Sequence, residues 1–166
     1  MPVREVIRYP NAILKTRLRP LAPGPEAEAL ARDLVDTMRA SSHSVGIAAN
    51  QVGVDARMFA LDVTGHKKAH SQHGLVVMLN PVVLHREDAE VAREGCMSVP
   101  DLTGDVRRAI RIVVQGERPE GGVFVVEADA FEARAFQHEL DHLDGLLFLD
   151  RIESPTAVFQ RKRYRR

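Results

Sequence analysis

The first clear periodic pattern of apolar residues lies between residues 26 and 39. Leu30, Leu34 and Met38 recur every four residues, which places them on one side of an α-helix. Pro25 precedes this stretch and acidic residues follow it, as is typical of a helix N-terminus, where backbone N–H groups are unpaired. The pattern therefore predicts an amphipathic helix over Glu26 to Arg39.

The middle of the chain changes to short apolar runs separated by glycine, proline or charged residues. Within one of them, Ile110, Ile112 and Val114 recur at every second position, a period that fits a strand with one buried face. Branched aliphatic residues dominate these runs, as they do in the strands of globular proteins. The pattern predicts four strands, at residues 58–63, 75–79, 109–114 and 123–126.

The helical period returns near the C-terminal end. Phe136, Leu140 and Leu143 follow spacings of four and three residues, and Gly145 stands where a helix commonly ends in a left-handed residue. We expect a second helix from Ala130 to Leu143. Strands grouped between two helices, without regular βαβ alternation, predict an α+β fold. In this fold, mostly antiparallel sheets pack around the second helix, with an N-terminal helix and a short C-terminal helical tail.

Composition narrows the class of protein. A chain of 166 residues has the size of one globular domain, which we expect to span residues 1–159. Its single cysteine, Cys96, excludes an intramolecular disulfide framework and favours a reducing compartment. No stretch fits a secretion signal, and no apolar run approaches the ~20 residues of a membrane span. We therefore expect a cytoplasmic protein with no membrane partner.

Charge is balanced over the whole chain but not along it. The 23 basic and 23 acidic residues cancel, which argues against a protein that mainly coats nucleic acid. The end of the chain is different, because residues 160–166 contain five cations and no acid: Arg161, Lys162, Arg163, Arg165 and Arg166. We therefore treat residues 160–166 as a separate basic tail.

The second predicted helix contains an HExxH pattern. At about 100° per residue, His138 and His142 leave the same side of the helix and can share one metal ion. Glu139 points about 100° away from His138, from where a carboxylate can reach a metal-polarised water as a general base. Phe131 and Ala135 lie on the histidine side. The pattern therefore predicts a metal site on one side of the helix and a core contact on the other.

The third ligand is not settled by the helix alone. A catalytic divalent ion usually takes three protein ligands and keeps one open position. The longer pattern HExxHxxGxxH fails here, because Phe148 stands where the third histidine would be. Glu153 is the lone glutamate after the pattern and lies close to the chain end. Cys96 remains as a soft ligand, although a lone buried cysteine is often only a small apolar residue.

Three segments together resemble the signatures of the peptide deformylase family. They read GIAANQ, EGCMS and QHELDH, at Gly46–Gln51, Glu94–Ser98 and Gln137–His142. Their order and spacing are those of the family, and the resemblance covers nearly the whole chain. It implies a hydrolase that removes the formyl group from the N-terminal formyl-methionine of newly synthesised proteins and releases formate. The implied partners are N-formyl-methionyl nascent peptides and, through the tail at residues 160–166, the ribosome.

The resemblance also implies the ligands and the metal. By position, Cys96, His138 and His142 would hold one divalent ion. A thiolate with two imidazoles suits zinc, iron, cobalt or nickel. The family resemblance implies Fe²⁺ as the physiological ion, with Zn²⁺, Ni²⁺ or Co²⁺ as ions that the purified protein can carry.

The same positions imply the catalytic and substrate-binding groups. Glu139 would be the catalytic acid and base. The Gln51 amide and the backbone N–H of Met97 would donate to the oxyanion that develops on the substrate. The backbone groups that would hold the peptide as an added strand belong to Val45, Gly46 and Gly95.

Two alternatives stay open. Ser44 and Asn50 stand where the first motif usually has glycine and proline, so the chain could be a catalytically impaired, deformylase-like binding protein. The HExxH pattern alone also fits a zinc peptidase. A further group, His66, His70 and His73, lies among polar residues, and we interpret it as part of a solvated loop rather than a second metal site.

Overall fold

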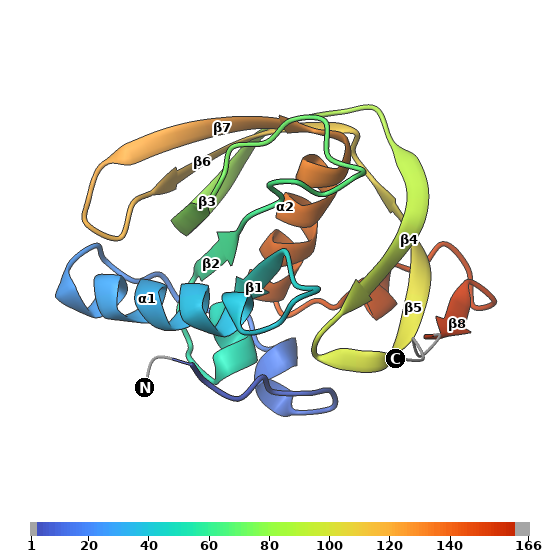
Figure 1. The fold of residues 1–166 in the computed structure, drawn as a ribbon, viewed down its shortest axis with the longest axis horizontal. Helices are drawn as coiled ribbons and strands as arrows, with labels where there is room; N and C mark the ends of the chain where they lie inside the picture. Colours follow the sequence, from blue (N-terminus) through green and yellow to red (C-terminus); the bar gives the residue numbers. More distant parts are fainter. Residues whose placement is uncertain (1–2, 162–166) are drawn as a thin grey trace.

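The computed structural model describes residues 3–161 of the chain (Figure 1). Its two α-helices are α1 (Pro25–Arg39) and α2 (Ala130–Leu143). Its strands are β1 (Gly46–Ala48), β2 (Met58–Leu61), β3 (Val76–Glu87), β4 (Glu90–Cys96), β5 (Val99–Arg108), β6 (Arg111–Glu117), β7 (Val123–Asp129) and β8 (Val158–Gln160). Three short 3-10 helices complete these elements: η1 (Ala12–Lys15), η2 (Ala49–Val52) and η3 (Phe148–Arg151).

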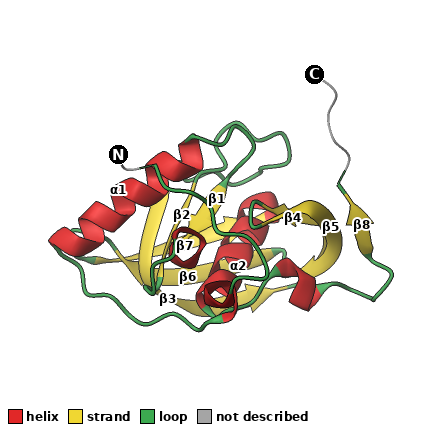
Figure 2. Ribbon diagram, turned by 90° about the horizontal axis from the view of Figure 1, so that it is seen from below, coloured by secondary structure: helices red, strands yellow, loops and turns green. Residues whose placement is uncertain are grey.

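The strands form two antiparallel sheets. The larger sheet has the order β1-β2-β3-β6-β7 and the smaller one the order β4-β5-β8. Helix α2 lies between them: the strands curve around it in Figure 1, and the small sheet stands to one side of it in Figure 2. This confirms the predicted α+β class, with mostly antiparallel sheets around the helix that carries the HExxH pattern.

Each sheet ends in a strand with a free edge next to this helix. Among residues 3–161, strand β1 pairs only with β2, and strand β4 pairs only with β5. An edge strand has unpaired N–H and C=O groups that can accept a further strand. The two sheets therefore present two such edges on either side of α2.

The main core confirms both predicted helices. The stripe of Leu30, Leu34 and Met38 on α1 is buried against the larger sheet. On α2, Phe136 is fully buried and its ring meets that of Phe59 edge to face, with 5.7 Å between the ring centroids. Burial of such side chains is the main favourable contribution to folding. It fixes which side of α2 faces the core and, by difference, which side carries the histidines.

The strand predictions are confirmed in place for β2, β3, β6 and β7, with shifted ends. Strands β4 and β5 were not predicted. Most of their exposed positions carry charged residues, the buried positions include the charged Glu94 and Arg108, and only a few apolar side chains reach a core. Apolar periodicity is too weak a signal for a small sheet of this kind.

The C-terminal end differs from the expected helical tail. Residues Val158–Gln160 form β8, which pairs with β5 through Phe159 and Thr103. Valine and phenylalanine favour strands. The backbone of this segment forms hydrogen bonds with β5, whereas a helix of so few residues would be only marginally stable by itself. Residues 162–166 of the predicted basic tail lie outside the described residues, so the division of the chain at residue 160 stays a prediction.

The end of α2 is held by a close backbone contact. Gly145 has φ +77°, and its N–H donates to the carbonyl of His142 at 3.1 Å. The backbone of Lys15 and Thr16 passes directly over it, so a Cβ at position 145 would lie 2.7 Å from the Lys15 carbonyl atoms. The glycine is therefore required for packing as well as for its dihedral angle.

We predict that Gly145→Ala lowers the free energy of unfolding by about 3 kcal/mol, because it adds a backbone clash to the strain of a positive φ. Gly65→Ala is the matched control: Gly65 has φ +76° but no atom within 4 Å of its Cβ position, so it should lose only about 1 kcal/mol. Denaturant unfolding measures both values. Equal losses in the two variants would show that the contact with η1 contributes nothing.

Candidate functional site

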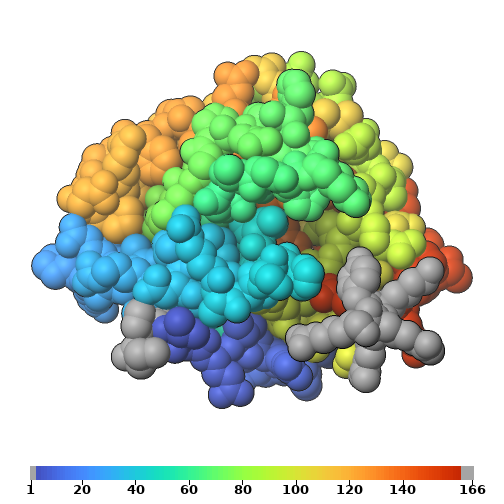
Figure 3. Space-filling model, in the orientation of Figure 1, coloured from blue at the N-terminus to red at the C-terminus, as the bar shows by residue number. Residues whose placement is uncertain are grey.

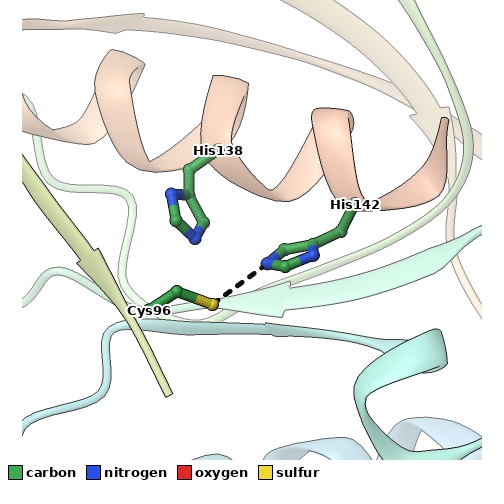
Figure 4. A group of neighbouring side chains, drawn as sticks. All are labelled: Cys96, His138 and His142. Atoms are coloured by element: carbon green, nitrogen blue, oxygen red, sulfur yellow. Dashed lines mark hydrogen bonds between the residues drawn. The ribbon is translucent and has the colours of Figure 1, made fainter. Parts of the chain in front are cut away.

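Three potential metal ligands from two distant motifs meet at the inner side of α2. Figure 4 shows His138 and His142 on successive turns of the helix, both pointing to Cys96 at the end of β4. Their ligand atoms all lie within 4.8 Å of one another, and Cys96 Sγ lies 3.4 Å from His142 Nε2. A sulfur and a nitrogen bound tetrahedrally to one zinc-like ion lie about 3.5 Å apart. The donor set and its spacing therefore fit one divalent ion.

The electrostatics of the cluster favour a cation. Burial raises the pKa of the Cys96 thiol, but the adjacent rings of His142 and His138 overcome this and hold that pKa well below its usual range. A thiolate is the form that binds metals. Among residues 3–161, this is the only group of three or more histidine, cysteine or acidic residues that converges in this way.

A buried ion network orients the first histidine. His138 Nδ1 lies 2.9 Å from Glu94 Oε1, so its N–H donates to the carboxylate and Nε2 is left for a metal. Arg108 donates to both Glu94 oxygens, at 2.9 and 3.0 Å, and Arg134 donates to Oε2 at 2.7 Å. Burial raises the pKa of Glu94, but the bonds from His138 and Arg108 outweigh it, so the pKa is lowered and the carboxylate is ionised.

Gln51 is placed beside the sulfur ligand. Its side-chain carbonyl accepts from the Ala48 N–H at 2.9 Å, which orients the amide so that Nε2 points to Ser98 Oγ at 3.0 Å and Cys96 Sγ at 3.5 Å. The side chain is almost fully buried. Gln51 is therefore a fixed donor next to the cluster, rather than an exposed polar turn residue.

Glu139 is a buried carboxylate with an unpaired oxygen. Oε1 has no hydrogen-bond partner among the described residues. Oε2 lies against the backbone of Gly46, where a Cβ would approach it to 2.6 Å. Burial raises the pKa of Glu139, while His138 and His142 lower it less strongly. An acid with raised pKa and no structural partner next to metal ligands is a general-base candidate.

Ser44 and Asn50, the two residues that depart from the family's first motif, each form a hydrogen bond in the structure. Asn50 is fully buried and donates through Nδ2 to the carbonyl of His142 at 2.8 Å. It therefore anchors the end of α2 that carries this ligand. Ser44 Oγ donates to the Gly46 carbonyl at 3.0 Å, within the segment that leads into β1. Neither residue displaces a member of the cluster.

The loop histidines do not form a second metal group. His70 pairs with Asp129 at 2.8 Å, and His73 donates its backbone N–H to the buried carboxylate of Glu132, also at 2.8 Å. His66 stacks on Phe131, with 3.9 Å between the ring centroids. The loop is exposed at His70 and His73, as expected, but it is anchored to the start of α2.

A cleft of about 1080 Å³ leads to His138 from the surface. Figure 3 shows the hollow between the segment near residue 45 and the strands β4 and β5. Phe131 and Ala135 line it together with His138, which confirms their prediction on the histidine side. Val45 and Gly95 lie on its walls.

The three residues that sequence patterns predict as ligands converge in the structure, but the patterns do not reveal all of the residues that support them. Arg134 has no sequence signal of its own, and Ser98 has only its place in the second motif. Both nevertheless contact a residue of the cluster or its neighbour. Arg108 is buried between Glu94 and Asp141 and forms an ion pair with each of them. The positions of Glu94 and Ser98 inside the second motif were the available signal.

A Cys-His-His group beside an unpaired carboxylate, reached through a cleft, is an arrangement typical of metal-dependent hydrolases. Comparison with known proteins gives its family. Residues 3–158 match the family described as "Polypeptide deformylase". The peptide deformylase of Desulforudis audaxviator is 40% identical and covers 98% of this chain, and the chain covers 99% of that protein.

Solved structures agree with this. The peptide deformylase of Thermotoga maritima superposes with a TM-score of 0.82 at 32% identity, covering 92% of this chain and 99% of its own. That of Thermus thermophilus gives a TM-score of 0.83 at 36% identity, with coverages of 92% and 88%. The chain belongs to the polypeptide deformylase family. It is an enzyme, and its function is to remove the formyl group from the N-terminus of newly made proteins.

We predict that Cys96→Ala and His142→Ala each reduce the metal content of the purified protein to background, because two remaining ligands bind a divalent ion too weakly to retain it. His70→Ala is the control: its side chain is 81% exposed and lies outside the cluster, so the variant should keep the metal of the parent. Elemental analysis measures the content. A fully loaded Cys96→Ala protein would contradict the assignment.

Proposed function

We propose that deformylation takes place at the Cys96–His138–His142 cluster, with Glu139 as the catalytic acid and base. One observation carries this proposal: the buried Glu139 carboxylate has an unpaired oxygen beside three converging metal ligands. A structural carboxylate at this depth would be paired. A group that is kept buried and unpaired is typical of an active site.

The three ligands would hold a divalent ion, for which we propose Fe²⁺. When bound, such an ion lowers the pKa of a water molecule and polarises a carbonyl group. The family resemblance, rather than the donor set, favours iron, since thiolate and imidazole also suit zinc, nickel and cobalt.

Glu139 would accept a proton from the attacking water and return it to the departing amine. Its raised pKa suits both steps, because a base with a very low pKa takes up protons poorly. Its Oε2 lies against the backbone of Gly46. The products are formate and a free N-terminal amine.

Two donors would stabilise the oxyanion that forms on the formyl carbon. Gln51 Nε2 is oriented by Ala48 and Ser98 before any charge develops. Met97 follows Cys96 in the turn between β4 and β5, so its backbone N–H is adjacent to the sulfur ligand. Donors of this kind, fixed in advance, contribute about 3 kcal/mol each to transition-state stabilisation.

The substrate peptide would bind as an extended strand between the two free edges. Val45 and Gly46 belong to the β1 side and Gly95 to the β4 side of the cleft. Backbone hydrogen bonds at such an edge do not depend on the sequence of the bound peptide. This mode suits an enzyme that acts on many different proteins.

The two alternatives are not favoured. A catalytically impaired binding protein would not need the unpaired Glu139 carboxylate, and a zinc peptidase of the longer HExxH type would need a ligand where Phe148 is buried. Turnover of a formyl-Met peptide, compared with cleavage of an unformylated peptide, separates the three functions.

We predict that Glu139→Gln retains the metal but lowers kcat on a formyl-Met peptide by about 10²–10⁴-fold, because an amide cannot accept the proton of the water. Glu120→Gln, at an exposed glutamate near the β6–β7 turn, is the matched control and should behave as the parent. Release of formate measures the rate. Near-normal turnover of Glu139→Gln would show that the proton takes another path.

We predict that the Fe²⁺-loaded enzyme loses activity in air faster than the Ni²⁺-loaded enzyme. Oxygen oxidises Fe²⁺ readily, and the Cys96 thiolate is open to oxidation as well. Activity followed over time in air and under nitrogen measures both half-lives. Equal half-lives for the two metals in air would contradict iron as the cause of the loss.

The basic tail would bring the enzyme to its substrates. We propose that the basic tail contacts ribosomal RNA in the cytoplasm, where formylated chains are made, through Lys162, Arg163, Arg165 and Arg166. Among residues 3–161, neither helix has the length and apolar character needed to cross a membrane. The attraction of basic residues to RNA scales with the number of phosphates that they neutralise.

We predict that replacing Lys162, Arg163, Arg165 and Arg166 with glutamine weakens co-sedimentation with ribosomes, most clearly at low salt, because phosphate contacts lose strength as salt rises. Arg161 is left unchanged because it lines the cleft. Ribosome affinity that is unchanged across salt concentrations would assign these cations to a solvated terminus.

A further inference from the structure

The last described residue, Arg161, is held in place by the small sheet. Its backbone N–H donates to the Asp101 carbonyl at 2.9 Å, which continues the β5–β8 ladder one residue beyond Gln160. The preceding Phe159 carries the guanidinium of Arg93 on its ring, 3.7 Å from the centroid. Arg93 is bonded in turn to Asp105 at 2.9 Å. The backbone of Arg161 is therefore anchored, although its side chain is exposed.

The side chain of Arg161 extends over Gly95. Phe159 pairs with Thr103, and Thr103 pairs with Gly95, so these positions lie on one face of the sheet. Arg161 follows two residues after Phe159 and shares that face. A Cβ on Gly95 would lie 3.2 Å from Arg161 Cζ, so the guanidinium occupies the space that a side chain there would fill. Gly95 directly precedes Cys96, the proposed sulfur ligand.

Among residues 3–161, no acidic side chain compensates the positive charge of Arg161 in the cleft. The other two arginines that line it are paired, Arg93 with Asp105 and Arg134 with Glu94. Arg161 makes no ion pair with any of residues 3–161. It also borders a neighbouring cavity of about 810 Å³, beside Arg8.

Few acidic residues oppose this charge. Glu94 is the lone acid of the larger cleft and is already held by Arg108, Arg134 and His138. Glu5 is the lone acid of the neighbouring cavity. The place where a strand added at the edge of β4 would pass Gly95 is therefore electropositive.

We infer that Arg161 is a specificity-determining residue that favours substrates with an acidic side chain just after the formyl-methionine. This inference rests on the proposed function, in which the reacting end of the peptide lies at Cys96. An extended peptide advances about 3.3 Å per residue, so its second or third residue passes Gly95. A carboxylate there meets the unpaired guanidinium.

The test uses the metal-loaded full-length enzyme and pairs of C-terminally amidated peptides. The two peptides of a pair differ only in whether one side chain carries a carboxylate or an amide. Formyl-Met-Asp-Ala is compared with formyl-Met-Asn-Ala, and formyl-Met-Ala-Asp with formyl-Met-Ala-Asn. Amidation leaves the aspartate as the peptide's lone carboxylate. In at least one pair, we expect kcat/KM to be about two- to fivefold higher for the aspartate peptide at low salt, as for a solvent-exposed ion pair. The higher kcat/KM should result from a lower KM for the aspartate peptide, and the difference should become smaller at high salt.

Variants assign the preference to Arg161. Arg161→Gln should abolish the difference between aspartate and asparagine, and Arg161→Lys should retain part of it because the charge remains. Arg118→Gln is the matched control, since this exposed arginine contacts Phe124 at the β6–β7 turn and should leave the difference unchanged. Turnover of the asparagine peptides tests the proposed function separately.

Two outcomes would overturn the inference. Normal turnover of all peptides with no preference in either pair would show that Arg161 does not contact the substrate. A rise in kcat/KM for every peptide in Arg161→Gln, acidic or not, would show that the side chain only obstructs the cleft. Failure to hydrolyse any formylated peptide would instead contradict the proposed function.

Discussion

The structure depends on one buried carboxylate, that of Glu94. It accepts hydrogen bonds from Arg108, Arg134 and His138, and so joins β4 to α2. Arg134 continues to the carbonyls of Val106 and Glu90. Removing one partner from such a network leaves an uncompensated buried charge, which costs about 3–5 kcal/mol. The cysteine and histidine ligands come from the two elements that this network joins, so it sets their distance.

The active site is assembled from strand edges as well as from a helix. In the proposed function, helix α2 supplies two of the metal ligands and the base, and the end of β4 supplies the third ligand. The two sheets do not pair with each other here, and this leaves β1 and β4 with free edges on both sides of the cleft. The unpaired edges, elsewhere a risk of aggregation, are the peptide-binding surface in the proposed function.

Much of this site could be predicted from the sequence because its chemistry is local. The spacing of His138 and His142 on one helix sets their common direction, and the residue types limit the ions that they bind. The small sheet could not be predicted in this way. Its strands bury few apolar residues, and they are held by cross-strand pairing and by ion pairs such as Arg93 with Asp105.

The C-terminal strand escaped prediction for a related reason. The charges of residues 160–166 indicate a solvated tail, but Phe159 and the free edge of β5 bring the start of this segment into the sheet. Asn50 is a similar case. In the sequence it is only a residue that differs from the family motif, and the structure shows that its side chain donates a hydrogen bond to the carbonyl of His142. Contacts over such sequence distances leave no periodic signal.

The contact between Gly46 and Glu139 links two residues that lie 93 positions apart in the sequence. The carboxylate takes up the volume that any side chain at position 46 would need. A larger residue at 46 could be accommodated only if residue 139 became shorter, and a shorter acid would no longer reach the same point beside the ligands. If Glu139 acts as in the proposed function, a mutational path that changes either residue first passes through a less active enzyme, so descendants of this chain can be expected to inherit the two positions together.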